Sequence, residues 1–131
     1  MTSSVDRAPT MRIVTAADVP PIPLGGAGSQ QVLLGEPCGD RSPLLMGITT
    51  LLPGGTSALI EHDTAEIAYV LSGSGWMVSD RSEHAFTAGD AIFIEARCWH
   101  AIRAGGDGVQ MLYVFPTPGV PATRVHESSA S

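Results

Sequence analysis

The chain has 131 residues, of which 44% are hydrophobic, enough to build one small domain around a single core. Its formal net charge is −6, and its seven basic residues are scattered arginines, which argues against nucleic-acid binding. The absence of lysine excludes Schiff-base chemistry and a Walker-type phosphate loop.

The N-terminal half is expected to contain strands separated by turns. Residues 1–10 are polar and predict a flexible arm, followed by a barrel domain over residues 11–119. Residues 11–14 predict a first strand, and a connector rich in proline and glycine follows it. Further strands are expected at residues 31–34 and 44–52.

The C-terminal half continues this all-β pattern. Short apolar runs with many β-branched and aromatic residues predict strands around residues 67–71, 91–94, 98–102 and 109–115. Fifteen glycines and ten prolines indicate many turns between short strands, and we expect no long helix. Residues 120–131 are expected to form a flexible tail.

A first stretch that carries candidate chemistry contains His62 and Glu66. A straight strand would hold these two side chains about 13 Å apart, too far to share one metal ion. The surrounding glycines and the strand-like run after Glu66 argue against a helix. We therefore expect a turn at residues 63–65, because the side chains of Asp and Thr readily hydrogen-bond their own backbone. His62 then ends one strand and Glu66 begins the next.

A second stretch repeats this arrangement. Gly89 and Asp90 predict a turn, residues 91–94 predict a buried strand, and a loop leads to His100 at the start of another strand. Two imidazoles and one carboxylate at turns between strands can meet at one point and hold a divalent transition metal.

These two stretches resemble the two sequence motifs of the cupins, which are small jelly-roll β-barrels, also described as double-stranded β-helices. The first motif is a glycine, five residues, His-x-His, three or four residues, a glutamate, six residues and a glycine. Gly54 or Gly55 opens it here, and His62, Glu66 and Gly73 match the rest. The second motif runs from a glycine through Pro-x-Gly to a histidine and an asparagine, and here Gly89 and His100 match.

The chain departs from both motifs. Ile60 replaces the first histidine, residues 95–97 replace Pro-x-Gly, and Ala104 stands at the asparagine position. The ligand set that the resemblance implies shrinks to His62, Glu66 and His100. Such a set suits Fe, Mn, Ni or Zn, and leaves coordination positions open for substrate.

The resemblance implies an enzyme that acts on a small organic metabolite, of the lyase, isomerase, cyclase or dioxygenase type. His62, Glu66 and His100 are then both the metal ligands and the catalytic residues. Two alternatives remain open at this stage. The barrel can be a metal-free module that binds a small molecule, or a metal-independent enzyme that uses the same three residues as acid and base.

Several other residues have simpler interpretations. Glu61 and Tyr69 alternate with the site residues and are expected to face away from them. His84 is expected at the surface, in a polar turn or at its edge. Cys38 and Cys98 are expected to be buried free thiols, although Cys98 shares a strand face with His100 and can line the pocket.

The remaining predictions concern location and assembly. No secretory signal and no stretch long enough to span a membrane is visible, which favours a cytoplasmic protein without membrane partners. An open jelly roll exposes strand edges, so we expect a homodimer that covers them. The only other partner that we expect is the small-molecule substrate.

Overall fold

The computed structural model describes residues 8–127. About half of these residues form β-strands, in which apolar and polar side chains alternate, and the two helical turns have three residues each. The strands are β1 (Ile22–Pro23), β2 (Gly28–Leu34), β3 (Leu45–Leu51), β4 (Ile60–His62), β5 (Glu66–Val78), β6 (Glu83–Thr87), β7 (Ala91–Ile94), β8 (Ala101–Phe115) and β9 (Thr123–Val125). The helical turns are η2 (Ala16–Asp18) and η3 (Glu36–Cys38). Within residues 8–127, no helix is long and apolar enough to cross a bilayer.

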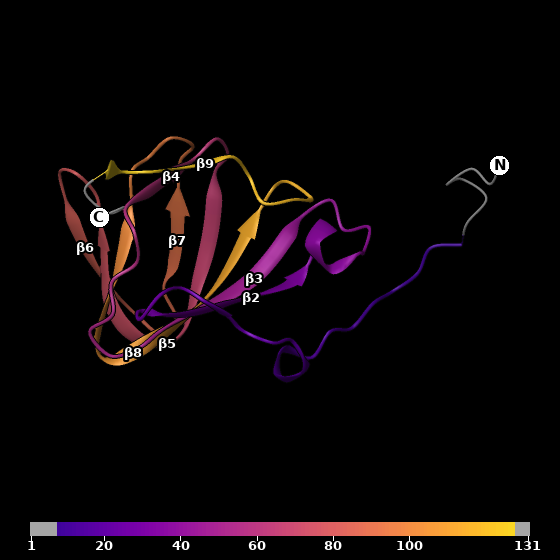
Figure 1. Cartoon of the computed structure of the whole chain (residues 1–131), viewed down its shortest axis with the longest axis horizontal. Helices are drawn as coiled ribbons and strands as arrows, with labels where there is room; N and C mark the ends of the chain where they lie inside the picture. The colour runs from indigo at the N-terminus through magenta and orange to yellow at the C-terminus, as the bar shows by residue number, and fades with distance from the viewer. Residues whose placement is uncertain (1–7, 128–131) are drawn as a thin grey trace.

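Seven of the strands form one antiparallel sheet in the order β1-β2-β3-β8-β5-β6, with β7 also paired to β5. The other two, β4 and β9, pair with each other and run across one end of the barrel (Figure 1). The two sheets are joined where Ile60 and His100 exchange backbone hydrogen bonds of 2.8 and 2.9 Å. This architecture confirms the predicted all-β jelly roll.

The curvature of the β5–β8 pair closes the barrel. β5 has thirteen residues and would extend about 40 Å if it were straight. Because β5 and β8 are antiparallel, the first residues of the two strands lie at opposite ends of the pair. The register shifts twice, between Val70 and Ser72 and between Gly73 and Gly75. Such irregularities bend a strand and increase its twist, and here they let the pair curl until its two ends meet.

The core lies on the inward face of the curled sheet. Every second residue of β8 from position 109 is buried, and Leu45, Leu51 and Val70 are almost fully enclosed. The opposite face of β5 is exposed at Ile67 and Tyr69, as alternation along a strand requires. The predicted outward orientation of Tyr69 is therefore confirmed.

The structure differs from the sequence predictions at both ends of the barrel. The strand predicted at residues 11–14 is wrong, because these residues are irregular and the first strand is β1, in the proline- and glycine-rich connector. Residues 123–125, which fall in the expected flexible tail, form β9 on β4. The prediction of flexibility at residues 1–7 and 128–131 lies outside the described residues.

Candidate metal centre

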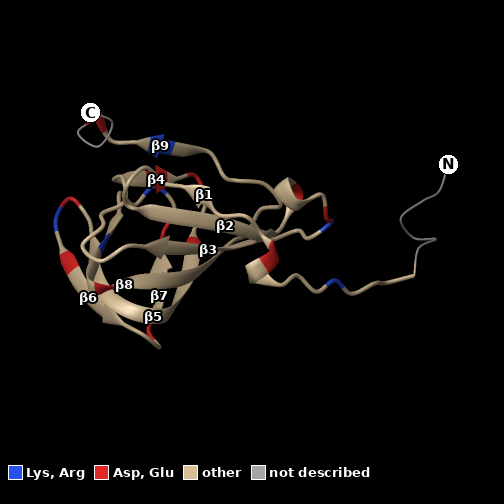
Figure 2. Cartoon of the chain, turned by 60° about the horizontal axis from the view of Figure 1, so that its bottom comes forward, with Lys and Arg blue, Asp and Glu red and all other residues tan. Residues whose placement is uncertain are grey.

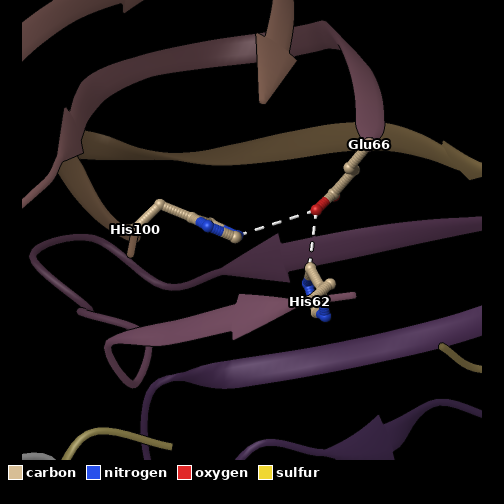
Figure 3. Close-up of side chains that lie close together, drawn as sticks. All are labelled: His62, Glu66 and His100. Atoms are coloured by element: carbon tan, nitrogen blue, oxygen red, sulfur yellow. Dashed lines mark ion pairs between the residues drawn. The ribbon is translucent and has the colours of Figure 1, made fainter. Parts of the chain in front are cut away.

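Three side chains meet at one point inside the barrel (Figure 3). His62 is the last residue of β4, Glu66 is the first residue of β5, and His100 directly precedes β8. The Oε1 atom of Glu66 lies 3.4 Å from Nε2 of His62 and 3.6 Å from Nε2 of His100. One nitrogen or oxygen atom from each of the three side chains lies within 4.8 Å of the others, so one ion can reach all of them.

The turn between His62 and Glu66 has the predicted position but not the predicted cause. β4 ends at His62 and β5 begins at Glu66, as expected. The hydroxyl oxygen of Thr64, however, is buried without a hydrogen-bond partner among the described residues. The backbone N–H of Asp63 instead donates to the carbonyl of Ala122, 3.0 Å away. The C-terminal segment therefore fixes this turn.

Each imidazole is held through its outer nitrogen. Nδ1 of His100 lies 2.8 Å from the carbonyl oxygen of Cys98, which can only accept a hydrogen bond. Nδ1 of His62 lies 2.7 Å from the hydroxyl of Thr123. Partners at Nδ1 fix the orientation of each ring and leave Nε2, which faces Glu66, as the candidate metal ligand.

The three groups are buried and interact electrostatically. His62 and His100 are 8% and 7% exposed. Burial by itself raises the pKa of Glu66, but the two imidazoles facing its carboxylate outweigh this effect and hold the pKa below its ordinary value of 4.5. Burial by itself lowers the pKa of His100, whereas hydrogen bonds to Glu66 and to the Cys98 carbonyl raise it above its ordinary value of 6.5.

The donor set fits a divalent transition metal. Two imidazole nitrogens and one carboxylate oxygen are the ligands found in facial sites for Fe(II), and they also suit Zn and similar ions. Ile60 supplies no donor atom, so the described cluster has three ligands and leaves further coordination positions open. An ion held at this point would take ligand charge from the carboxylate of Glu66.

A cavity of about 640 Å³ opens beside His100. Its inner walls include the apolar side chains of Met77, Phe86, Ile92 and Ile94, and its lining also includes polar residues. The polar residues are Ser79, Ser82, His84, Asp90, Glu95 and Cys98. No arginine lies among the described residues that line this cavity. The cavity therefore suits an uncharged, largely apolar molecule with a few polar atoms.

Some individual predictions need correction. His84 is exposed, as predicted, in β6 at the edge of the turn over residues 79–82, and it also lines the cavity, which was not predicted. Cys98 is exposed at the cavity, so the expectation of a buried thiol is wrong for it, while Cys38 is partly buried. Glu61 points away from the site, as predicted, and pairs with Nε of Arg124 at 2.5 Å.

Two neighbours of His62 are not predicted from the sequence. The ring of Phe115 packs edge-on against the imidazole, with 4.8 Å between ring centroids. Thr123 holds Nδ1 from β9. The alternation of buried residues in β8 is a signal for Phe115. A strand of only three residues that follows a segment with three prolines gives no signal strong enough to find Thr123.

A family model described as "Cupin domain" matches residues 47–115 of the chain. No curated protein matches the sequence closely enough to count as a relative. The chain is similar to several solved structures. One is the polyketide cyclase RemF from Streptomyces resistomycificus, with 24% identity, a TM-score of 0.75 and coverage of 88% of this chain and 85% of that chain.

Two further structures have the same fold. An RmlC-like cupin from Shewanella frigidimarina has 19% identity and a TM-score of 0.69, with 84% of this chain and 93% of that chain covered. Oxalate decarboxylase from Bacillus subtilis has 21% identity and a TM-score of 0.75, with 90% of this chain but only 33% of that chain covered. The TM-scores of these matches establish the fold. Because the sequence identities are low, the chemistry has to be argued from the site.

Proposed function

The chain belongs to the cupin family, and we propose that it is a metal-dependent enzyme acting on a small organic metabolite in the barrel cavity. The observation that carries this proposal is the convergence of His62, Glu66 and His100, with both Nε2 atoms facing one carboxylate oxygen. Partners at both Nδ1 atoms support the role of these imidazoles as ligands.

The cavity lining supports a neutral carbonyl compound as the substrate. A small dianion such as oxalate needs cationic partners, and the described lining contains no arginine but does contain Asp90 and Glu95. The apolar walls formed by Phe86, Ile92 and Ile94 bind an apolar carbon skeleton and exclude water. The polyketide cyclase RemF is similar to this protein over most of both chains. We therefore favour a cyclase- or isomerase-type reaction.

The residues around the substrate have distinct roles in this proposal. His62, Glu66 and His100 would hold the ion, which when bound would supply Lewis acidity to a carbonyl or enol oxygen. His84 and Glu95 line the same cavity and are the groups available to accept or return a proton beside the substrate. Removing a proton next to a polarised carbonyl is the step that cyclisation and isomerisation share.

Metal analysis of the purified protein tests the proposal. Protein isolated without chelator is expected to contain about one equivalent of Fe, Mn, Ni or Zn, measured by elemental analysis before and after reconstitution. His100→Ala should lose this metal, because it removes one of three ligands. His84→Ala is the matched control, since His84 lines the cavity outside the cluster, and it should keep the metal.

Absence of metal from the reconstituted wild-type protein would contradict the proposal. A metal-independent acid–base enzyme is then the second candidate, and two observations favour it. Ile60 removes one family ligand, and Glu66 already faces both imidazoles as an ion-pair partner. A metal-free binding module is distinguished from that enzyme by the absence of turnover with carbonyl substrates.

A further inference from the structure

The hydroxyl of Thr123 contacts two groups and has one hydrogen to donate. The carbonyl oxygen of Pro121, 2.9 Å away, can only accept, so the hydroxyl donates its hydrogen there. The 2.7 Å contact between Thr123 Oγ1 and His62 Nδ1 allows either atom to donate, and we assign the N–H to the imidazole because the hydrogen of the hydroxyl is already used. A neutral imidazole has one N–H, so placing it on Nδ1 leaves a lone pair on Nε2.

That lone pair lies where a metal ligand is needed. Nε2 of His62 faces Oε1 of Glu66 at 3.4 Å, and the side chain of His62 is 9% exposed. The opposite tautomer would place the N–H where an ion has to bind. Thr123 thus selects the tautomer in which His62 is a ligand, although it is 61 residues away in the sequence.

Strand β9 delivers this hydroxyl through pairing on both sides of it. Thr123 is the direct cross-strand partner of His62, and Arg124 is the partner of Glu61. Arg124 binds Glu61 through Nε at 2.5 Å and Asp63 through Nη2 at 2.9 Å. In Figure 2 the basic segment of β9 lies over the acidic segment of β4. The two carboxylates on either side of His62 therefore anchor β9 in register.

The two histidines differ in what positions them. His100 is held by a carbonyl only two residues before it in the same loop. His62 depends on a segment from the far end of the chain. Pairing of β9 therefore bears directly on the ring of His62, whereas the hydrogen bond that orients the ring of His100 comes from its own loop.

We propose that Thr123 is a positioning residue of the metal centre, and that β9 controls metal affinity by holding His62 in its ligating tautomer. This inference rests on the proposed function and adds the C-terminal strand to the site. Loss of an outer hydrogen bond to a ligating histidine typically weakens metal binding by about 10- to 100-fold.

The test compares three variants with the wild-type protein. Thr123→Val keeps the shape and strand preference of the side chain and removes the hydroxyl, whereas Thr123→Ser restores it. Thr117→Val is the matched control, because the Thr117 hydroxyl donates to the carbonyl of Gly119 at 2.8 Å. That carbonyl belongs to the loop before β9 and not to the metal centre.

Two measurements are made on each protein. Affinity for Co²⁺ is determined by competition with a chelator, with the absorption of bound Co²⁺ as a spectroscopic signature. Nitrogen-15 shifts of the histidine rings are recorded on the metal-free protein over a series of increasing pH, until the signals of His62 no longer change. Thr123→Val is expected to bind Co²⁺ about 10- to 100-fold more weakly and to shift the tautomer signals of His62. Thr123→Ser and Thr117→Val should match the wild type.

Unchanged Co²⁺ affinity in Thr123→Val would overturn the inference. So would wild-type shifts that place the proton of His62 on Nε2, a result that needs no variant. If the wild-type protein binds no Co²⁺, the proposed function fails, while the ring shifts of the metal-free protein still decide the role of Thr123.

Discussion

Among single residues, Glu66 and His100 make the stability of the metal-free protein depend on pH in two opposite ways. The lowered pKa of Glu66 means that its charge stabilises the fold above pH 4.5, and this contribution is lost as pH falls through the lowered pKa. The raised pKa of His100 means that its charge contributes fully below pH 6.5, and this contribution is lost as pH rises through the raised pKa.

We therefore expect metal-free protein to be most stable between pH 4.5 and 6.5, measured by urea unfolding across a pH series. Glu66→Gln should flatten this profile on both sides, because it removes the carboxylate and the partner that raises the pKa of His100. Glu83→Gln is a matched control, since Glu83 pairs with Arg103 at an exposed site. An unchanged profile in Glu66→Gln would contradict the assignment.

Ile60 offers a test of the missing ligand. It lies two residues before His62 on β4, so both side chains belong to the same face of the strand. Ile60→His should add a fourth donor to the cluster and tighten Zn²⁺ binding by about 10-fold or more. Competition with a chelator measures this change, and Ile60→Gln controls for polarity. Equal affinity in Ile60→His and wild type would show that position 60 does not face the ion.

Among the elements, the β5–β8 pair decides whether the site exists. Glu66 begins β5 and His100 precedes β8, so the antiparallel pairing places them at opposite ends of the pair. Their side chains nevertheless meet, with 3.6 Å between Oε1 of Glu66 and Nε2 of His100 (Figure 3). The pair curls at its register shifts, which brings its two ends together. Gly73 sits at one of these shifts with a φ of 82°, and a Cβ atom there would lie 2.0 Å from the carbonyl oxygen of Gly108.

Gly73→Ala is therefore expected to destabilise the protein by about 3 kcal/mol or more, since it adds both backbone strain and a clash with backbone. Gly106→Ala is the matched control on β8, because a Cβ atom at Gly106 would have no neighbour within 4 Å. Its effect should stay within about 0.5 kcal/mol. Chemical denaturation measures both values. Equal stability of the two variants would show that the curl does not depend on Gly73.

The sequence predicts strands well where burial alternates and poorly where another segment decides the structure. The strands predicted at residues 44–52 and 91–94 lie close to the observed β3 and β7. The spacing of His62, Glu66 and His100 predicts the site, because turns and strand ends fix where those side chains point. Residues 123–125 could not be predicted, because three residues become a strand only through pairing with β4.

For the whole molecule, the exposed apolar residues bear on the predicted homodimer. Met11 and Ile13 are 98% and 94% exposed on an arm that runs away from the barrel (Figure 1). A groove of about 360 Å³ on the outer face of β5 and β7 is lined by apolar residues that include Ile67 and Phe93. A chain that exposes both a strand-like apolar arm and an apolar groove can bury both by pairing with a second copy.

We expect the arm of one copy to lie on the β5–β7 face of the other. Residues 11–14 are irregular in the single chain and leave Met11 and Ile13 exposed, and an apolar groove on a second copy can cover these two side chains. Wild-type protein should be a dimer by light scattering at micromolar concentration. A Met11→Ser, Ile13→Ser double variant and a Phe93→Ser variant should both shift it toward monomer, because each removes one side of the same contact. Leu52→Ser, an exposed apolar position away from both surfaces, should leave the dimer intact. A monomeric wild type would show that these surfaces have another use.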